Sequence, residues 1–308
     1  MSNGSNPRWP PLPYDGWKDT YQTLHMWTQI VGKIRLAQMP WLNHCWQVTF
    51  YPTASGLTTG PMPYGGEHLQ IEFDFLAHAL VFQTSSGERR SVALTPMSVA
   101  AFYRIVMDTL AGLRMPVRIY NKPCEVQSQI AFDVDEVHRS YDAESAHRCW
   151  RILRSSADVL SRFRSRFYGK ASPVHFFWGS FDLAVTRFSG RTAPEHPGGV
   201  PHLADRVTRD AYSHEVSSCG FWPGGDAAPY PLFYSYAHPE PSGFADAPLS
   251  PAEARYDPAL REFVLPYDAI RDSAAPDEKL LAFLQSTYEA AADRGGWDRR
   301  ALEVTRAL

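Results

Sequence analysis

Apolar residues recur at helical spacing in four long segments of the chain. In the first of them, Leu24, Trp27, Val31 and Ile34 fall every three or four positions, as residues on one side of a helix do. Pro40 follows this segment, and proline cannot continue a helix. The same spacing predicts helices over residues 18–38, 95–112, 143–168 and 276–292.

Between these helices, apolar and polar residues alternate over short stretches, which is typical of strands with one buried face. The turn residues at 85–88 separate two such stretches and predict a hairpin. The alternation predicts strands over residues 44–51, 69–75, 79–84, 89–94, 175–188, 213–222, 232–238 and 261–266, with a short edge strand at 117–120.

The order of these elements repeats, because each half of the chain runs from a helix through several strands to a second helix. His44 and Trp46 follow the first helix much as His175 and Trp178 follow the third. We therefore predict an α+β protein of two pseudo-repeated α-ββββ-α halves, with antiparallel sheets and helices packed on one face. Generic α+β patterns that align by chance are the alternative to duplication.

Proline content and loop lengths divide the chain further. We expect a Pro-rich N-terminal arm at residues 1–16, an N-terminal half at 17–128 and a C-terminal half at 129–308. Two segments of the C-terminal half, 190–210 and 223–260, are predicted as long loops. Because long loops in compact proteins often surround binding sites, we place the candidate site in this half.

Composition limits the classes of function. The chain has 308 residues, with 30 basic and 33 acidic side chains, so its charge gives no bulk attraction to nucleic acid. No apolar run is long enough for a membrane helix, and no signal peptide is evident, so we expect no membrane association. Its four scattered cysteines indicate reduced thiols and a cytoplasmic location. Its 41 aromatic residues (9 Trp, 15 Tyr and 17 Phe) favour large packed surfaces or an aromatic pocket.

Four stretches resemble a bacterial family that is catalogued only as a domain of unknown function. They are LHMWTQIVGKIRLA (24–37), SPVHFFWGSFDLAVTRFSGR (172–191), HEVSSCGFWPGG (214–225) and FLQSTYEAAA (283–292). The resemblance covers nearly the whole chain and implies a cytoplasmic bacterial protein of a single module. It implies no activity, cofactor or catalytic residue.

The strand predicted at 175–188 carries the first candidate binding residues. Strict alternation places His175 and Arg187 on one face, and Trp178, Asp182 and other polar residues on the opposite face. A solvated sheet face rarely needs tryptophan, so the second row is a candidate pocket lining. Packing of Trp178 beneath a loop is the alternative interpretation.

The run from 213 to 222 is the second candidate region. Alternation separates His214 from Glu215 and Cys219, and the small residues around them leave room for a ligand. A metal cage of His175 and His214 with His238 or Glu215 is one alternative, although no ligand pair has diagnostic spacing. A Cys219 nucleophile is another, and an inert buried thiol is the commoner outcome for such a residue.

The leading hypothesis is a small-molecule site in the C-terminal half, with His214 or Glu215 as the acid or base if the protein is an enzyme. The cofactor is unknown, and no metal is assigned. The alternative is a non-catalytic binding or interaction module, for a protein partner or for a homo-oligomer. The expected ligand-binding residues are His175, Trp178, Asp182, Arg187, Cys219, Trp222, Tyr236 and His238.

Overall fold

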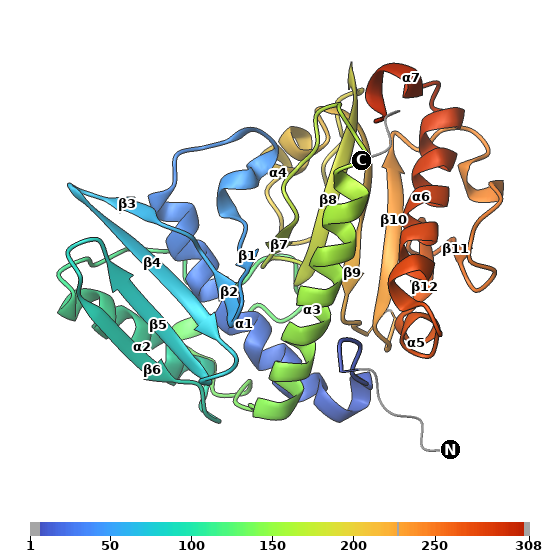
Figure 1. Ribbon diagram of the computed structural model, residues 1–308. Helices are drawn as coiled ribbons and strands as arrows, with labels where there is room; N and C mark the ends of the chain where they lie inside the picture. Colours follow the sequence, from blue (N-terminus) through green and yellow to red (C-terminus); the bar gives the residue numbers. More distant parts are fainter. Residues whose placement is uncertain (1–6, 227, 305–308) are drawn as a thin grey trace, which may run out of the picture.

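The computed structural model of the protein describes residues 7–226 and 228–304. The α+β class predicted from the sequence is confirmed. Two antiparallel sheets of six strands each stand side by side, one from each half of the chain (Figure 1). We call them the N-terminal sheet and the C-terminal sheet. Each half has six strands instead of the four expected, and duplication of the halves stays a prediction.

The N-terminal sheet has the order β1-β2-β4-β5-β6, and β3 pairs with β4. One face is buried, as the alternating burial of β4 shows. Phe73 of this face stacks on Phe102 of helix α2, and Phe102 stacks in turn on Trp27 of helix α1. The strands are β1 (Tyr51–Pro52), β2 (Gly56–Thr58), β3 (Met62–Tyr64), β4 (Glu67–Asp74), β5 (Ala79–Thr84) and β6 (Arg89–Ala93); the helices are α1 (Tyr14–Gln38) and α2 (Val99–Gly112).

The C-terminal sheet has the order β11-β12-β10-β9-β8-β7. Helices α3 and α6 pack against one another and against its central strands, and they lie beside these strands in Figure 1. The strands are β7 (His175–Phe177), β8 (Asp182–Thr192), β9 (His214–Trp222), β10 (Leu232–His238), β11 (Arg255–Asp257) and β12 (Glu262–Pro266). The helices are α3 (Ala143–Arg164), α4 (Asp205–Ala211), α5 (Tyr267–Arg271), α6 (Pro276–Arg294) and α7 (Arg299–Leu302), with 3-10 turns η1 (Asn43–Val48), η2 (Phe132–Val134) and η3 (Phe244–Asp246).

Local sequence signals set the helix starts. The Ser98 hydroxyl accepts a hydrogen bond from the backbone of Ala101, and the Asp142 carboxylate accepts one from the backbone of Ser145. These side chains satisfy amide groups that the first turn of a helix leaves free. Pro276 occupies the first turn of α6, where its missing N–H is not needed.

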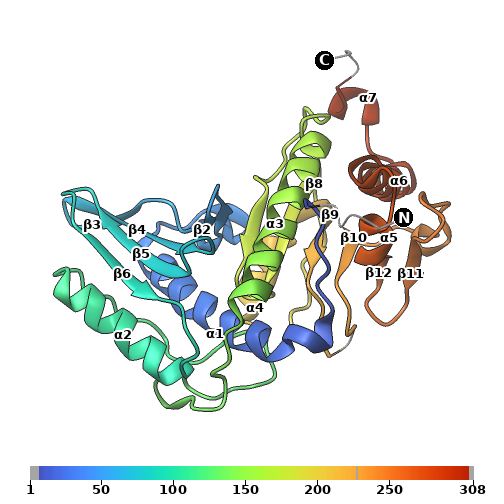
Figure 2. The same ribbon diagram turned by 60° about the horizontal axis from the view of Figure 1, so that its bottom comes forward.

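Helix α1 joins the two halves. Figure 2 shows it extending from the C-terminal half toward the N-terminal sheet. It is buried along most of its length, including Gln29, Lys33 and Arg35. Gly32 lies against the indole of Trp178, and a Cβ at this position would overlap the ring. A helix buried on nearly all sides acts as a shared core element, and here it requires glycine at the closest approach.

The N-terminal arm packs onto the C-terminal half. Trp9 is buried against Phe233 and Tyr267, and the Tyr267 hydroxyl donates to the carbonyl of Pro10. Residues 1–6 of the arm predicted at 1–16 lie outside the described residues. The domain boundaries stay a prediction, although one hydrophobic core runs through both halves.

Four element predictions are wrong. Residues 44–51 begin with the 3-10 turn η1, because His44 and Cys45 adopt a left-handed backbone. Residues 175–188 form two strands instead of one, and no strand forms at 117–120. The segments 190–210 and 223–260, predicted as long loops around the strand expected at 232–238, also hold α4, η3 and β11. These short elements escape pattern analysis because tertiary contacts, more than periodicity, define them.

Candidate functional site

The two faces of the C-terminal sheet carry different kinds of side chain. Directly paired residues of an antiparallel ladder point to the same side. On the side of α3 and α6, which we call the helix face, the central rows are apolar; one row is Leu183, Phe221 and Phe233. On the opposite side, which we call the polar face, the rows read Ala184–Gly220–Tyr234 and Thr186–Ser218–Tyr236.

Asp182 is the most deeply placed acid of the polar face. It begins β8, is 8% exposed, and accepts a hydrogen bond from the Tyr234 hydroxyl. Burial raises the pKa of Asp182 to about 7, because a charged carboxylate loses its hydration there, and the Tyr234 hydroxyl opposes this only in part. Its carboxyl group therefore exchanges a proton near neutral pH.

A chain of three phenols extends from this acid. The Tyr234 and Tyr236 rings are stacked, with centroids 6.2 Å apart, and the Tyr212 hydroxyl donates to the Tyr236 hydroxyl at 3.1 Å. Tyr212 also lies against His238, with centroids 4.7 Å apart. Burial raises the pKa of all three phenols, so they stay protonated and act as hydrogen-bond donors. Tyr234 is buried, whereas Tyr212 and Tyr236 are only partly buried, so the cluster reaches the surface on the side of Tyr236.

A second acid, Glu262 of β12, shares this face, because Val264 pairs with Tyr234 and residues alternate along a strand. The pKa of Glu262 is raised to about 8, mainly by burial and to a smaller extent by the negative charges of Asp182 and Asp257. In the part of the chain that the structure describes, neither Asp182 nor Glu262 has a lysine or arginine partner. A buried carboxyl without a cation is costly, and such groups concentrate at functional sites.

The structure separates the ten residues expected at the site. The polar face holds His175, Asp182, His214, Trp222, Tyr236 and His238. The helix face holds Arg187, Glu215 and Cys219, whereas Trp178 lies in the turn between β7 and β8. Asp182, Tyr236 and His238 belong to one cluster of connected side chains, through Tyr234 and Tyr212.

Arg187 and Cys219 have structural surroundings. The Arg187 guanidinium lies 3.5 Å from the ring centroid of Phe163 and donates to the carbonyl of the same residue. Burial lowers the pKa of Arg187 to about 10 and raises the pKa of Cys219 to about 12. Cys219 is 3% exposed, so its thiol is protonated and inaccessible, unlike a catalytic thiolate.

His175 and Trp178 are placed by the turn that divides the strand predicted at 175–188. The turn brings His175 onto the face of Ala184, so it does not share a face with Arg187. His175 is fully buried beside Phe177 and Trp46, and neither ring nitrogen has a hydrogen-bond partner among the described residues. Burial lowers its pKa to about 3, so the ring is neutral. Trp178 donates to the carbonyl of Val48 at 2.7 Å and joins the two halves.

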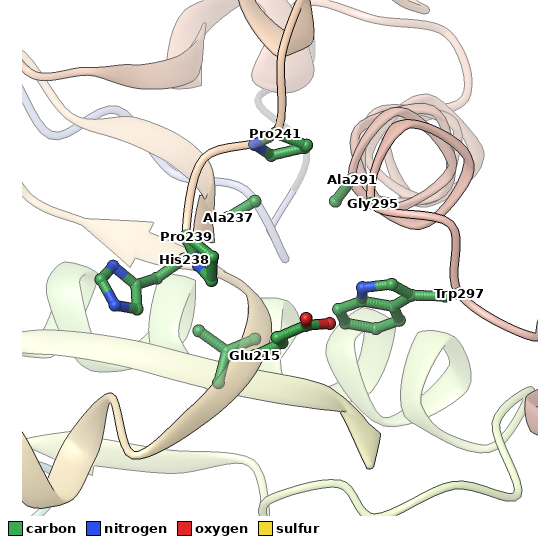
Figure 3. A pocket seen from close by; sticks show the side chains of 9 residues that line it. Glu215, Ala237, His238, Pro239, Pro241, Ala291, Gly295 and Trp297 are labelled. Atoms are coloured by element: carbon green, nitrogen blue, oxygen red, sulfur yellow. The ribbon is translucent and has the colours of Figure 1, made fainter. Parts of the chain in front are cut away.

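Glu215 lines a depression of about 160 Å³ at the ends of β9, β10 and α6. Figure 3 shows its carboxylate directed toward Trp297, while the His238 ring points the other way. Arg191 binds the Glu215 carboxylate at 2.7 Å and also donates to the carbonyls of Gly295 and Gly296. This ion pair therefore fixes the end of β9 to the end of α6, where helix carbonyls lack partners.

His214 lies apart from the cluster of Asp182, Tyr236 and His238 and from the depression lined by Glu215. Its ring is perpendicular to that of His44, with centroids 5.7 Å apart, and its Nδ1 contacts the Ser213 hydroxyl at 3.1 Å. Trp46 contacts both His44 and His175, so these rings separate His214 from His175. Within residues 7–226 and 228–304, no three His, Cys, Asp or Glu side chains converge as metal ligands, so the cage considered from the sequence does not form there.

Sequence reasoning missed Tyr234, Tyr212 and Glu262. Tyr234 had a signal, because it lies two residues before Tyr236 in a strand and must share its face. The sequence carries no signal for Tyr212 or Glu262. The pairing of β12 with β10 brings Glu262 to this face, and a ring contact with Tyr236 brings Tyr212 there.

The comparisons with known proteins give a family but no activity. The model of a family of unknown function, DUF5996, matches residues 9–304. No curated protein and no solved structure shows a significant match. No helix in the described ranges has the length and apolar composition needed to cross a membrane.

Proposed function

Because the chain belongs to the DUF5996 family of unknown function, its role must be inferred from its own residues, and we propose that it binds a small organic molecule on the polar face. The observation that supports this is the buried carboxyl of Asp182 and the partly buried carboxyl of Glu262, beside three phenols and without a cationic partner among the described residues. In this proposal Asp182 exchanges a proton with the ligand, and Tyr236 and Trp222 contact it at the partly buried margin.

The charges around the site favour a ligand that carries positive charge. The charged and phenolic groups that act on Asp182 and Glu262 are carboxyls and the Tyr234 hydroxyl. An organic ammonium group would neutralise these acids, and the faces of Tyr234, Tyr236 and Trp222 offer cation–π contacts. His214 and Glu215, the acid or base expected from the sequence, are replaced in this proposal by Asp182.

Tetramethylammonium chloride is a direct probe of this site. We expect it to raise the thermal unfolding midpoint of the protein more than sodium chloride does at equal ionic strength. At pH 8, above the raised pKa of Asp182, Asp182→Asn should remove this difference, because it takes away the carboxylate charge while it keeps an acceptor for Tyr234. Asp19→Asn, on exposed helix surface, is the matched control and should keep the difference. Equal midpoints in both salts for the unmodified protein would count against a cationic ligand.

Native mass spectrometry of the purified protein extends the test to ligands of any charge. A copurified molecule that is lost in Asp182→Asn and in Tyr236→Phe would support binding at the polar face. A molecule retained by both variants would place the site elsewhere.

An interaction module is the second candidate, because apolar residues in the last turn of α1 and just after it are exposed. Leu36, Trp41 and Leu42 are 44%, 65% and 48% exposed. Such exposed groups in one segment are common at protein–protein contacts. Light scattering across a concentration series, with Trp41→Ser as the comparison, tests the homo-oligomer that this candidate predicts.

The compartment stays an expectation as well. All four cysteines are free thiols in the structure, which supports a reducing, cytoplasmic location.

A further inference from the structure

A second cluster of reactive side chains lies where η1 of the N-terminal half meets the C-terminal half. The Lys170 ammonium lies 2.6 Å from Nε2 of His44. It also lies 4.8 Å from the ring centroid of Phe188 and 5.4 Å from that of Trp46. In the described part of the chain, no carboxylate forms an ion pair with Lys170, so its nearest polar partner is an imidazole.

The protonation of this imidazole follows from its other contact. Nδ1 of His44 lies 3.1 Å from the backbone carbonyl of Asp210, and a carbonyl oxygen can only accept. Nδ1 therefore carries the hydrogen, and Nε2 presents a lone pair to Lys170. Burial disfavours positive charge on both partners and lowers the pKa of His44 and of Lys170. The charge of Lys170 also lowers the pKa of His44, and Asp210 partly opposes these effects.

The backbone holds His44 in place. His44 and Cys45 are consecutive residues with φ of 61° and 57°, a left-handed conformation that side chains other than glycine rarely adopt. The Asp210 carboxylate accepts a hydrogen bond from the Cys45 backbone at 3.0 Å. Strained residues of this kind persist where surrounding contacts fix them, and they concentrate at functional sites.

We propose that Lys170 and His44 form a nucleophilic amine site for small aldehydes or ketones. The neutral amine of Lys170 attacks the carbonyl carbon, and Nε2 of His44 takes one proton from the nitrogen and passes it to the carbonyl oxygen, which becomes a hydroxyl. The second proton of the nitrogen follows the same route to the hydroxyl, which leaves as water, and a C=N bond joins Lys170 to the former carbonyl carbon. Lys170 is exposed, so a carbonyl compound reaches it from solvent.

Reductive methylation with limiting ¹³C-formaldehyde and cyanoborohydride at pH 7 tests this site, because it proceeds through such an imine. Peptide mass spectrometry then compares Lys170 with Lys18 and Lys122, which are also exposed. We expect Lys170 to react several-fold faster than either control lysine, because burial lowers its pKa and leaves more of it as free amine, and because Nε2 of His44 accepts its proton. Its rate should also reach half of its maximum at a lower pH than the rates of the two control lysines.

His44→Asn tests the partner. Asparagine tolerates the left-handed backbone but lacks the basic ring nitrogen. The rate at Lys170 should fall to that of Lys18, with an unchanged circular dichroism spectrum as the folding control. The proposal is overturned if Lys170 in the unmodified protein reacts no faster than the control lysines. A fast Lys170 that is indifferent to His44→Asn also overturns it, since the pair would then not act together.

Discussion

The two faces of the C-terminal sheet show how one set of strands serves structure on one side and offers chemistry on the other. The helix face buries Phe221 and Phe233 under α3 and α6, and its buried cation Arg187 is enclosed by aromatic rings. The polar face buries Asp182 and partly buries Glu262, and the loss of hydration opposes the ionisation of both. The helix face is therefore arranged for stability, whereas the polar face holds groups that stability alone would not select.

The largest change in the free energy of unfolding is expected for a substitution on the helix face. Phe221 is fully buried and packs against Phe233 and Tyr267. Phe221→Ala should lower the free energy of unfolding by about 3–5 kcal/mol, as core deletions of phenylalanine do. Chemical denaturation measures it. A loss under about 1 kcal/mol would show that this face is not a tightly packed core.

A substitution on the polar face should instead raise the free energy of unfolding. The pKa of Asp182 is raised to about 7 in the fold, while an aspartate in the unfolded chain titrates near 4. As the pH rises from about 4 to about 7, the unfolded chain releases this proton and the folded chain retains it, so stability falls across that window. Asp182→Asn should remove this loss and raise the free energy of unfolding by about 2–4 kcal/mol at pH 8.

Denaturation of the same variant at pH 4 is the internal control. At that pH Asp182 is protonated in the folded protein and still partly protonated in the unfolded chain, so its pKa shift costs little stability. The gain should be small at that pH. A variant that is less stable than the unmodified protein at pH 8 would show that the Asp182 charge supports the fold.

The smallest effect on stability is expected at the margin of the polar face. Tyr236→Phe removes one hydroxyl, which accepts from Tyr212, and should cost about 1 kcal/mol or less. The same change should weaken binding of the tetramethylammonium probe measurably. A stability loss well above that value, with unchanged binding, would make Tyr236 a structural residue.

The sequence predicts the long elements, because periodicity over many residues survives tertiary contacts. Strands β5 and β10 begin and end at the residues predicted for them. The site was harder to predict, since one turn at 178–181 changes the face on which His175 lies. Alternation found Asp182 and Tyr236 as candidates, but it had no means to bring Glu262 beside them, because that contact depends on the order of strands in the sheet.

The central claim is that Asp182 holds a proton at neutral pH on a face built for a ligand. Its most direct test is a pH titration of the side-chain carboxyl carbons by NMR, in protein labelled with ¹³C-aspartate, with Asp182→Asn to assign the signal. The account predicts one aspartate with a midpoint near 7, absent from the variant. If every aspartate carboxyl titrates below about pH 5, near the ordinary value, the claim is contradicted.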